Sequence, residues 1–206
     1  MDIKKVLIIG AGQMGSGIAQ VMAQGGIEVM IRDIKEEFVE KGIAGITKRL
    51  ARSVEKGKIT EEEKEAILTR ISGTVELGST ACDVDLVVEA AIENEKIKKD
   101  VFQQLDALCP EHTILASNTS SLPLTMIASF TKRPQQVIGM HFFNPAPVMK
   151  LVEVIKGLAT SEETTASVKA LAEKLGKTPV EVNDAPGFVG NRIVIPMINE
   201  AIFFFF

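Results

Sequence analysis

A glycine-rich turn that directly follows an apolar strand constrains this chain more than any other feature. Residues 6–9 read Val-Leu-Ile-Ile and run into a Gly-x-Gly-x-x-Gly pattern. In such a pattern Gly10 permits a tight turn, Gly12 lets a pyrophosphate approach the backbone, and Gly15 allows a helix to pack closely on the sheet. Apolar residues at helical spacing follow within residues 18–22. This context predicts a helix whose N-terminus faces phosphate groups, and it argues against a glycine turn in an unrelated α/β protein.

An acidic residue follows the second expected strand. The apolar run of residues 27–31 ends at Asp33, about 20 residues beyond the glycines. A carboxylate at this position accepts the hydroxyls of an adenosine ribose and repels a 2′-phosphate. The sequence therefore favours NAD over NADP. The neighbouring guanidinium of Arg32 weakens this preference and keeps NADP open as an alternative.

Composition excludes several classes of function. The chain has 206 residues, with 46% apolar and 24% charged side chains, which is typical of a globular protein. Its net charge of −4 and the lack of a dense Lys/Arg block give no reason to expect a nucleic-acid partner. No stretch approaches the roughly 18 apolar residues of a membrane span. Cys82 and Cys109 have no metal-ligand spacing. We therefore expect a reduced, cytoplasmic protein without a metal.

The order of the expected elements indicates an α/β fold. Further strands are expected at residues 85–91, 113–117, 136–143, 149–155 and 178–183, with helices at 95–108 and 161–175. This alternation predicts a Rossmann-type, doubly wound, mostly parallel sheet with helices on both faces. Residues 36–70 are charged and predict a helical hairpin inserted into this pattern. Within it, Thr60 and Glu63 have the spacing of a capping box that opens the second helix.

The C-terminal end has a different pattern. A long apolar helix is expected from Phe188 to Ile202, interrupted at Pro196. We interpret residues 1–185 as an NAD-binding domain and residues 186–206 as the first helix of a truncated, all-α C-terminal domain. Four phenylalanines then end the chain, which leaves three explanations: truncation, a frameshift, or a natural end buried in a partner. The first two are favoured because the preceding helix has no C-cap.

The chain has two histidines, and His141 is the one placed for chemistry. It lies near the end of an apolar strand, and the carboxyl ends of parallel strands are where ligands bind. Glu153 lies inside the next apolar strand, where a buried acid needs a partner. If the two strands pair antiparallel, the carboxylate fixes the imidazole tautomer, and the other ring nitrogen can exchange a proton. A core histidine and a buried structural ion pair are the alternatives. His112 follows Pro110 in a turn, where we expect it to be exposed and inert.

Polar residues follow another expected strand. Residues 117–121, Ser-Asn-Thr-Ser-Ser, could hydrogen-bond a substrate oxygen or the nicotinamide ribose, or a serine could cap a helix that begins at Leu122. Asn191, in the first turns of the last helix, is either a second ligand of that oxygen or a solvent-facing residue. The chain contains no Gly-x-Ser-x-Gly elbow, no kinase motifs and no further flavin-binding motif. Serine hydrolases, kinases and FAD enzymes are therefore disfavoured.

Five motifs, taken in order and spacing, resemble the short-chain L-3-hydroxyacyl-CoA dehydrogenase family, especially its bacterial 3-hydroxybutyryl-CoA dehydrogenases. The motifs are Gly-Ala-Gly-Gln-Met-Gly-Ser-Gly-Ile-Ala-Gln at residues 10–20, the cluster at 117–121, Gly-Met-His-Phe-Phe-Asn-Pro at 139–145, Leu-Val-Glu-Val at 151–154, and Asn-Asp-Ala-Pro-Gly-Phe-Val-Gly-Asn-Arg at 183–192. Each motif alone is weak, but together they are specific. The resemblance covers residues 3–202.

The resemblance implies roles for individual residues. His141 matches the catalytic base and Glu153 its orienting partner. Ser120 and Asn191 match the residues that hold the substrate's C3 oxygen. The positions that the resemblance assigns to the cofactor are Gly10, Gly12, Gln13, Met14, Gly15, Asp33, Glu93, Lys98, Ser120 and Asn144. In the helical hairpin, Arg52 and Lys56 resemble the basic positions that contact coenzyme A.

The resemblance also implies a reaction and an assembly. It indicates oxidation of (S)-3-hydroxyacyl-CoA by NAD, with His141 removing the proton of the 3-hydroxyl group as hydride leaves C3. It further implies a homodimer, whose dimerisation domain is mostly absent from this chain. Two alternatives remain open: a dehydrogenase of another 3-hydroxy acid, such as a sugar acid, and an inactive, truncated NAD-binding relative. The charged hairpin favours coenzyme A, and the paired His141 and Glu153 argue against a loss of chemistry.

Overall fold

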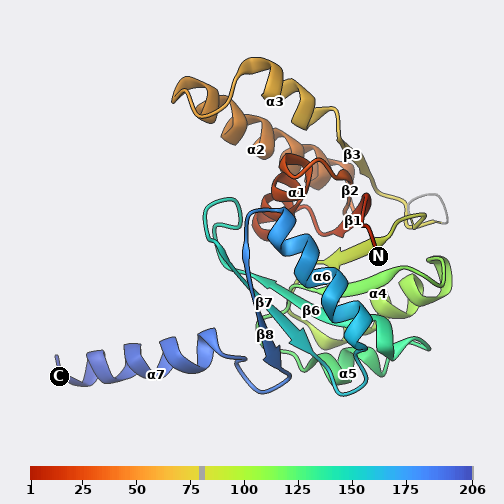
Figure 1. Ribbon diagram of the computed structural model, residues 1–206, viewed down its shortest axis with the longest axis vertical. Coiled ribbons are helices and arrows are strands. Elements are labelled where there is room, and N and C mark those ends of the chain that lie inside the picture. Colours follow the sequence, from red (N-terminus) through yellow and green to blue (C-terminus); the bar gives the residue numbers. More distant parts are fainter. Residues whose placement is uncertain (79–81, 206) are drawn as a thin grey trace.

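The described residues build one eight-stranded sheet that carries helices on both faces (Figure 1). The computed structural model describes residues 1–78 and 82–205. The strands are β1 (Lys5–Ile9), β2 (Glu28–Arg32), β3 (Ile71–Thr74), β4 (Leu86–Glu89), β5 (Ile114–Ser117), β6 (Val137–Phe142), β7 (Leu151–Lys156) and β8 (Thr178–Asn183). The α-helices are α1 (Gln13–Gln24), α2 (Glu36–Glu55), α3 (Glu61–Leu68), α4 (Glu95–Leu108), α5 (Leu124–Ala128), α6 (Glu162–Lys174) and α7 (Gly190–Phe203), and a 3-10 turn spans Pro134–Gln136.

The strand order places a ligand cleft at one edge of the sheet. The order is β3-β2-β1-β4-β5-β6-β7-β8, and every neighbouring pair is parallel except β6 and β7. The direction in which strands are added to the sheet reverses at β1: β2 and β3 lie on one side of it, and β4 lies next to it on the other side. The carboxyl ends of β1, β4, β5 and β6 meet at a common edge, which is where open α/β sheets bind ligands. The expected doubly wound, mostly parallel fold is confirmed.

Two apolar cores lie on opposite faces of the sheet. On β1, Val6 and Ile8 belong to the core that also contains Ile18 of α1. Leu7 and Ile9 point to the other face, where the core contains residues of α4 and α5. Because the central strands are buried on both faces, they form continuous apolar runs rather than an alternating pattern. This explains why the sequence predicts them well.

The charged hairpin expected at residues 36–70 is present as α2 and α3, which project from one end of the molecule (Figure 1). The predicted capping box is confirmed, because the Thr60 hydroxyl accepts the Glu63 N–H while the Glu63 carboxylate accepts the Thr60 N–H. Strand β3 follows the hairpin and was not expected from the sequence. It is a four-residue edge strand that pairs with β2 alone and reads Ile-Ser-Gly-Thr. Such a strand has no apolar run to reveal it.

The last helix differs from the expectation at its start and in its middle. Phe188 is not helical: its side chain is buried, and its backbone has φ 51°. Helix α7 begins at Gly190 and continues through Pro196 without interruption. None of its residues is buried, and it extends away from the sheet (Figure 1). Phe206, part of the phenylalanine run, lies outside the described residues. Within the described ranges, no helix combines the length and the apolarity needed to cross a bilayer.

Candidate active site

The glycine turn between β1 and α1 has the geometry that its sequence predicts. Gly10 has φ +102°, and a Cβ atom there would lie 2.6 Å from the Ala90 carbonyl oxygen. A Cβ on Gly15 would lie 1.8 Å from the Gly10 carbonyl oxygen, so only glycine lets α1 pack this closely. A Cβ on Gly12 would meet nothing within 4 Å. The turn therefore leaves open space at Gly12, beside the N-terminus of α1, and a pyrophosphate fits there.

A cleft of about 700 Å³ lies beside this turn, and Asp33 is part of its wall. The Asp33 carboxylate accepts hydrogen bonds from the N–H groups of Ala11 and Ile34, both at 2.7 Å. These bonds hold the carboxylate in the cleft, where it can accept ribose hydroxyls and repel a 2′-phosphate. Arg32 lines the same cleft, but its Nε donates to the Val75 carbonyl oxygen at 3.2 Å. The guanidinium is thus tethered to the end of β3.

His141 and Glu153 form a buried pair across β6 and β7. The two strands pair antiparallel, which is the condition on which the expected contact depended, and the two residues are register partners. His141 Nδ1 lies 2.7 Å from Glu153 Oε2, and the side chains are 9% and 1% exposed. Because a carboxylate can only accept, the proton of a neutral imidazole lies on Nδ1. The ring's other nitrogen, Nε2, is then its proton acceptor.

The second oxygen of Glu153 holds the start of α7. Oε1 accepts the N–H groups of Val189 at 3.0 Å and Gly190 at 2.7 Å. A negative charge at a helix N-terminus is favourable, because the free N–H groups and the helix dipole point toward it. The rings of Phe143 and Phe188 also pack against the imidazole, with centroids 4.7 and 5.8 Å away. Glu153 therefore connects the imidazole to the last helix.

A cavity of about 350 Å³ opens at the imidazole of His141. The other expected site residues that line it are Met14, Glu93, Lys98, Ser120, Asn144 and Asn191. The Asn191 amide Nδ2 donates to the Ser120 carbonyl oxygen at 3.3 Å, so the two expected ligands of the substrate oxygen lie together. The fold thus brings residues from five separate segments of the chain to one cavity.

No serine of the 117–121 cluster caps α5, which corrects one of the alternatives. The helix begins at Leu124, and Asp184 at the end of β8 accepts its first N–H groups, at 3.0 Å from Leu124 and 2.7 Å from Thr125. The Thr119 hydroxyl accepts the Leu122 N–H in the preceding turn, at 2.9 Å. The cap is supplied by a residue about 60 positions away, which local spacing does not reveal.

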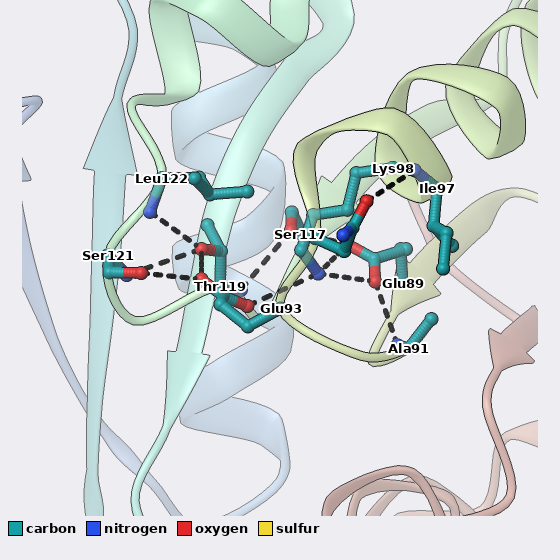
Figure 2. Close-up of polar contacts among 10 residues, drawn as sticks. Glu89, Ala91, Glu93, Ile97, Lys98, Ser117, Thr119, Ser121 and Leu122 are labelled. Atoms are coloured by element: carbon teal, nitrogen blue, oxygen red, sulfur yellow. Dashed lines mark hydrogen bonds and ion pairs between the residues drawn. The ribbon is translucent and has the colours of Figure 1, made fainter.

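Glu93 and Lys98 belong to a polar network at the wall of the cavity (Figure 2). The Lys98 ammonium lies 3.4 Å from Glu93 Oε2. The hydroxyl groups of Thr119 and Ser121 both donate to Glu93 Oε1. Burial opposes ionisation of Glu93, but the hydroxyl donors and the ammonium outweigh it and hold its pKa below the ordinary value. The carboxylate is therefore ionised at neutral pH.

Other predicted residues lie at the glycine turn or on the hairpin. Gln13 Nε2 donates to Asn144 Oδ1 at 2.9 Å, which links the glycine turn to the loop after β6. Arg52 and Lys56 are exposed near the end of α2, and neither lines the two cavities described above. His112 is exposed, as expected.

Sequence reasoning missed three residues that contact the imidazole, line the cavity or directly precede a residue that lines it. Asn118 lines the cavity and accepts the Phe142 N–H at 2.9 Å, although only its cluster was identified. Phe188 was assigned to a helix, and no local signal reveals its left-handed backbone. Glu89 is a fully buried acid at the end of β4. The signal that identified Glu153, an acid inside an apolar strand, was also present at Glu89.

A dinucleotide-type cradle next to a buried histidine–carboxylate pair defines an NAD-dependent dehydrogenase. The chain belongs to the 3-hydroxyacyl-CoA dehydrogenase family: the family's NAD binding domain matches residues 5–185. This confirms the oxidoreductase class and NAD as cofactor.

Comparison with known proteins agrees with this assignment. The chain is 59% identical over 203 residues to a probable 3-hydroxybutyryl-CoA dehydrogenase of Bacillus subtilis. This match covers 98% of this chain and 70% of that protein. It is 51% identical over 198 residues to the 3-hydroxybutyryl-CoA dehydrogenase of Clostridioides difficile, with 96% and 70% coverage. The crystal structure of (S)-3-hydroxybutyryl-CoA dehydrogenase from Ralstonia eutropha superposes with a TM-score of 0.94 at 48% identity, covering 97% of this chain and 70% of that one.

Proposed function

We propose that this chain interconverts (S)-3-hydroxybutyryl-CoA and acetoacetyl-CoA with NAD as cofactor. The observation that carries the proposal is the His141–Glu153 pair, joined at 2.7 Å, at a cavity beside the glycine turn. The names of the relatives supply the C4 substrate. A dehydrogenase of another 3-hydroxy acid remains the second candidate, since the pair itself does not select the acyl group.

The imidazole moves the proton. With Nδ1–H donated to Glu153, Nε2 accepts the proton of the 3-hydroxyl group, and the carboxylate stabilises the imidazolium that forms. In the reverse direction the imidazolium returns this proton to the C3 oxygen. Ser120 and Asn191 hold that oxygen and stabilise the charge that develops on it. The bound nicotinamide supplies the acceptor for the hydride that leaves C3.

Two separate groups of residues would bind the two halves of the cofactor. The turn from Gly10 to Gly15, which includes Gln13 and Met14, receives the pyrophosphate, and Asp33 receives the adenosine ribose. Glu93, Lys98, Ser120 and Asn144, which line the cavity, would hold the nicotinamide half. Arg52 near the end of α2 and Lys56 just beyond it are exposed, and they would bind the phosphates of coenzyme A.

The direct test is an assay of the 206-residue chain with acetoacetyl-CoA, following the absorbance of reduced nicotinamide. We expect NADH to be oxidised, and NADPH to be used at least about tenfold less efficiently, because its 2′-phosphate meets the fixed Asp33 carboxylate. A 3-hydroxy sugar acid and its keto product serve as the control substrates. Turnover of the sugar acid alone would favour the second candidate. If neither cofactor responds with any substrate, the chain is an inactive NAD-binding relative.

The apolar surface of α7 supports a proposal about domains and assembly. Ile193, Ile195 and Met197 are 61%, 62% and 60% exposed, although they are apolar. Burying such a surface is favourable, at about 25 cal/mol per Å². We propose that residues 1–185 form the NAD-binding domain, and that residues 186–206 are the first part of a helical domain and suffice to join two copies in a homodimer.

Size-exclusion chromatography with light scattering tests this assembly. We expect twice the 22.3 kDa mass of one chain. Ile195→Glu should shift the protein to a monomer, because the carboxylate must be desolvated at the interface. Ala66→Glu on α3, an exposed position away from α7, is the matched control and should leave the mass unchanged. A wild-type chain that is monomeric at all concentrations would contradict the proposal.

A further inference from the structure

A second buried acid, Glu89, lies at the carboxyl end of β4. Its side chain is completely buried, and the Lys98 side chain is 1% exposed. The Lys98 ammonium lies 2.6 Å from Glu89 Oε1 and 2.8 Å from Oε2. The proposed reaction gives Glu89 no role, yet it lies one residue before Ala90, which lines the cavity.

The contacts of Glu89 leave its carboxylate little freedom. Besides Lys98, it accepts the Ser117 hydroxyl at 2.7 Å and the Ala91 N–H at 2.8 Å (Figure 2). Ser117 is the register partner of Glu89 on β5, so both ends of the contact lie on the rigid sheet. These contacts fix the position of the ammonium, which belongs to the first turn of α4.

Lys98 is the member of this pair that lines the cavity, together with Glu93. Its ammonium lies much closer to Glu89 than to Glu93, whose Oε2 is 3.4 Å away. If the charge of Glu89 is removed, Glu93 is the carboxylate that remains beside the ammonium. The Lys98 ammonium and the Glu93 carboxylate then draw together, and both change position at the cavity wall. A buried ion pair adds little net stability by itself, so stability alone does not account for this arrangement.

We infer that Glu89 is a positioning residue for the nicotinamide half of the cofactor, which it affects only by holding Lys98 at the cavity wall. The inference depends on the proposed placement of the nicotinamide half along Glu93 and Lys98. Glu89 does not touch the cofactor, but by this inference it is one of the residues that determine the affinity for NADH. Its effect is therefore confined to ligands that carry the nicotinamide half.

Two probes separate this role from a structural one. NADH and ADP share the adenosine and the pyrophosphate, but ADP lacks the nicotinamide ring and its ribose. For Glu89→Gln we expect NADH to bind about tenfold more weakly, measured by fluorescence titration, and ADP affinity, measured by calorimetry, to change less than twofold. General damage to the fold would weaken both probes together.

Asp106→Asn is the matched control. Asp106 also lies on α4, and its carboxylate holds a cation, with Oδ1 at 2.9 Å from Arg133 Nε. Neither residue lines the His141 cavity. This variant should lower thermal stability and leave both affinities unchanged. If it weakens NADH binding as much as Glu89→Gln does, the selectivity claimed for Glu89 is wrong.

A double-mutant cycle tests the route through Lys98. Lys98→Met should weaken NADH binding by itself, and Glu89→Gln added to it should cause no further loss, because the acid then has no ammonium to hold. Additive losses would overturn the inference.

If Glu89→Gln does not fold, Ser117→Ala provides the test, because it removes one hydrogen-bond donor to the same carboxylate. We expect this variant to bind NADH about threefold more weakly. Wild-type affinity in Ser117→Ala and Glu89→Gln would also overturn the inference.

The inference and the proposed function fail in different ways. If the wild-type chain binds NADH and Lys98→Met weakens it while Glu89→Gln does not, only the role of Glu89 is refuted. If the wild-type chain neither binds NADH nor turns over acetoacetyl-CoA, the proposed function itself is refuted.

Discussion

His141→Gln should lower kcat/KM for acetoacetyl-CoA reduction by about 10³-fold or more. Glutamine can still hydrogen-bond the substrate oxygen and Glu153, but it cannot take up or release a proton near neutral pH. The loss therefore isolates proton transfer from substrate positioning. NADH affinity should be unchanged, because the glycine turn that holds the pyrophosphate belongs to β1 and α1. Steady-state kinetics and an NADH titration on the same preparation measure the two effects.

The chain offers a matched control for this variant. His112 is its other histidine, and the side chain is 55% exposed, with Nε2 3.9 Å from Asp85 Oδ1. His112→Gln should retain wild-type kinetics. A folded His141→Gln protein with near-normal turnover would refute the role of the imidazole as base, whatever the control shows.

The pair could be predicted because its determinants are local. The strands expected at residues 136–143 and 149–155 are neighbours in sequence, and antiparallel pairing between them brings His141 opposite Glu153. A buried acid also requires a partner, which identified Glu153 from its strand alone. What local pattern could not show is the second contact of Glu153. Its other oxygen accepts the N–H groups of Val189 and Gly190, which depends on where the chain returns after β8.

Three other features that sequence reasoning missed share this dependence on distant parts of the chain. Strand β3 is stabilised by its parallel pairing with β2, not by an apolar run of its own. The cap of α5 comes from Asp184, whose hydrogen bonds to the helix exist only once β8 has joined the sheet. Phe188 has a positive φ, which residues other than glycine rarely adopt. No local residue pattern predicts it. Tertiary structure, not local propensity, sets each of these features.

The glycine turn allows the cofactor site and the fold to be tested separately, with the same substitution at two positions. Gly12→Ala should fold normally, because a Cβ there meets nothing within 4 Å. It should nevertheless bind NADH about 10²-fold more weakly, since the methyl group occupies the space through which a pyrophosphate approaches the backbone. Titration with NADH and thermal denaturation measure the two properties.

Gly15→Ala should have the opposite profile. Its Cβ would lie 1.8 Å from the Gly10 carbonyl oxygen, so α1 must move away from the turn after β1. We expect a loss of about 3 kcal/mol in the free energy of unfolding, which overpacking of this severity causes, and a melting temperature lower by roughly 6–12 °C. Equal stability of the two variants would contradict the packing argument. NADH binding to Gly12→Ala as tight as that of the wild type would show instead that the pyrophosphate does not pass over this turn, because that substitution leaves the fold intact and changes only the open space above Gly12.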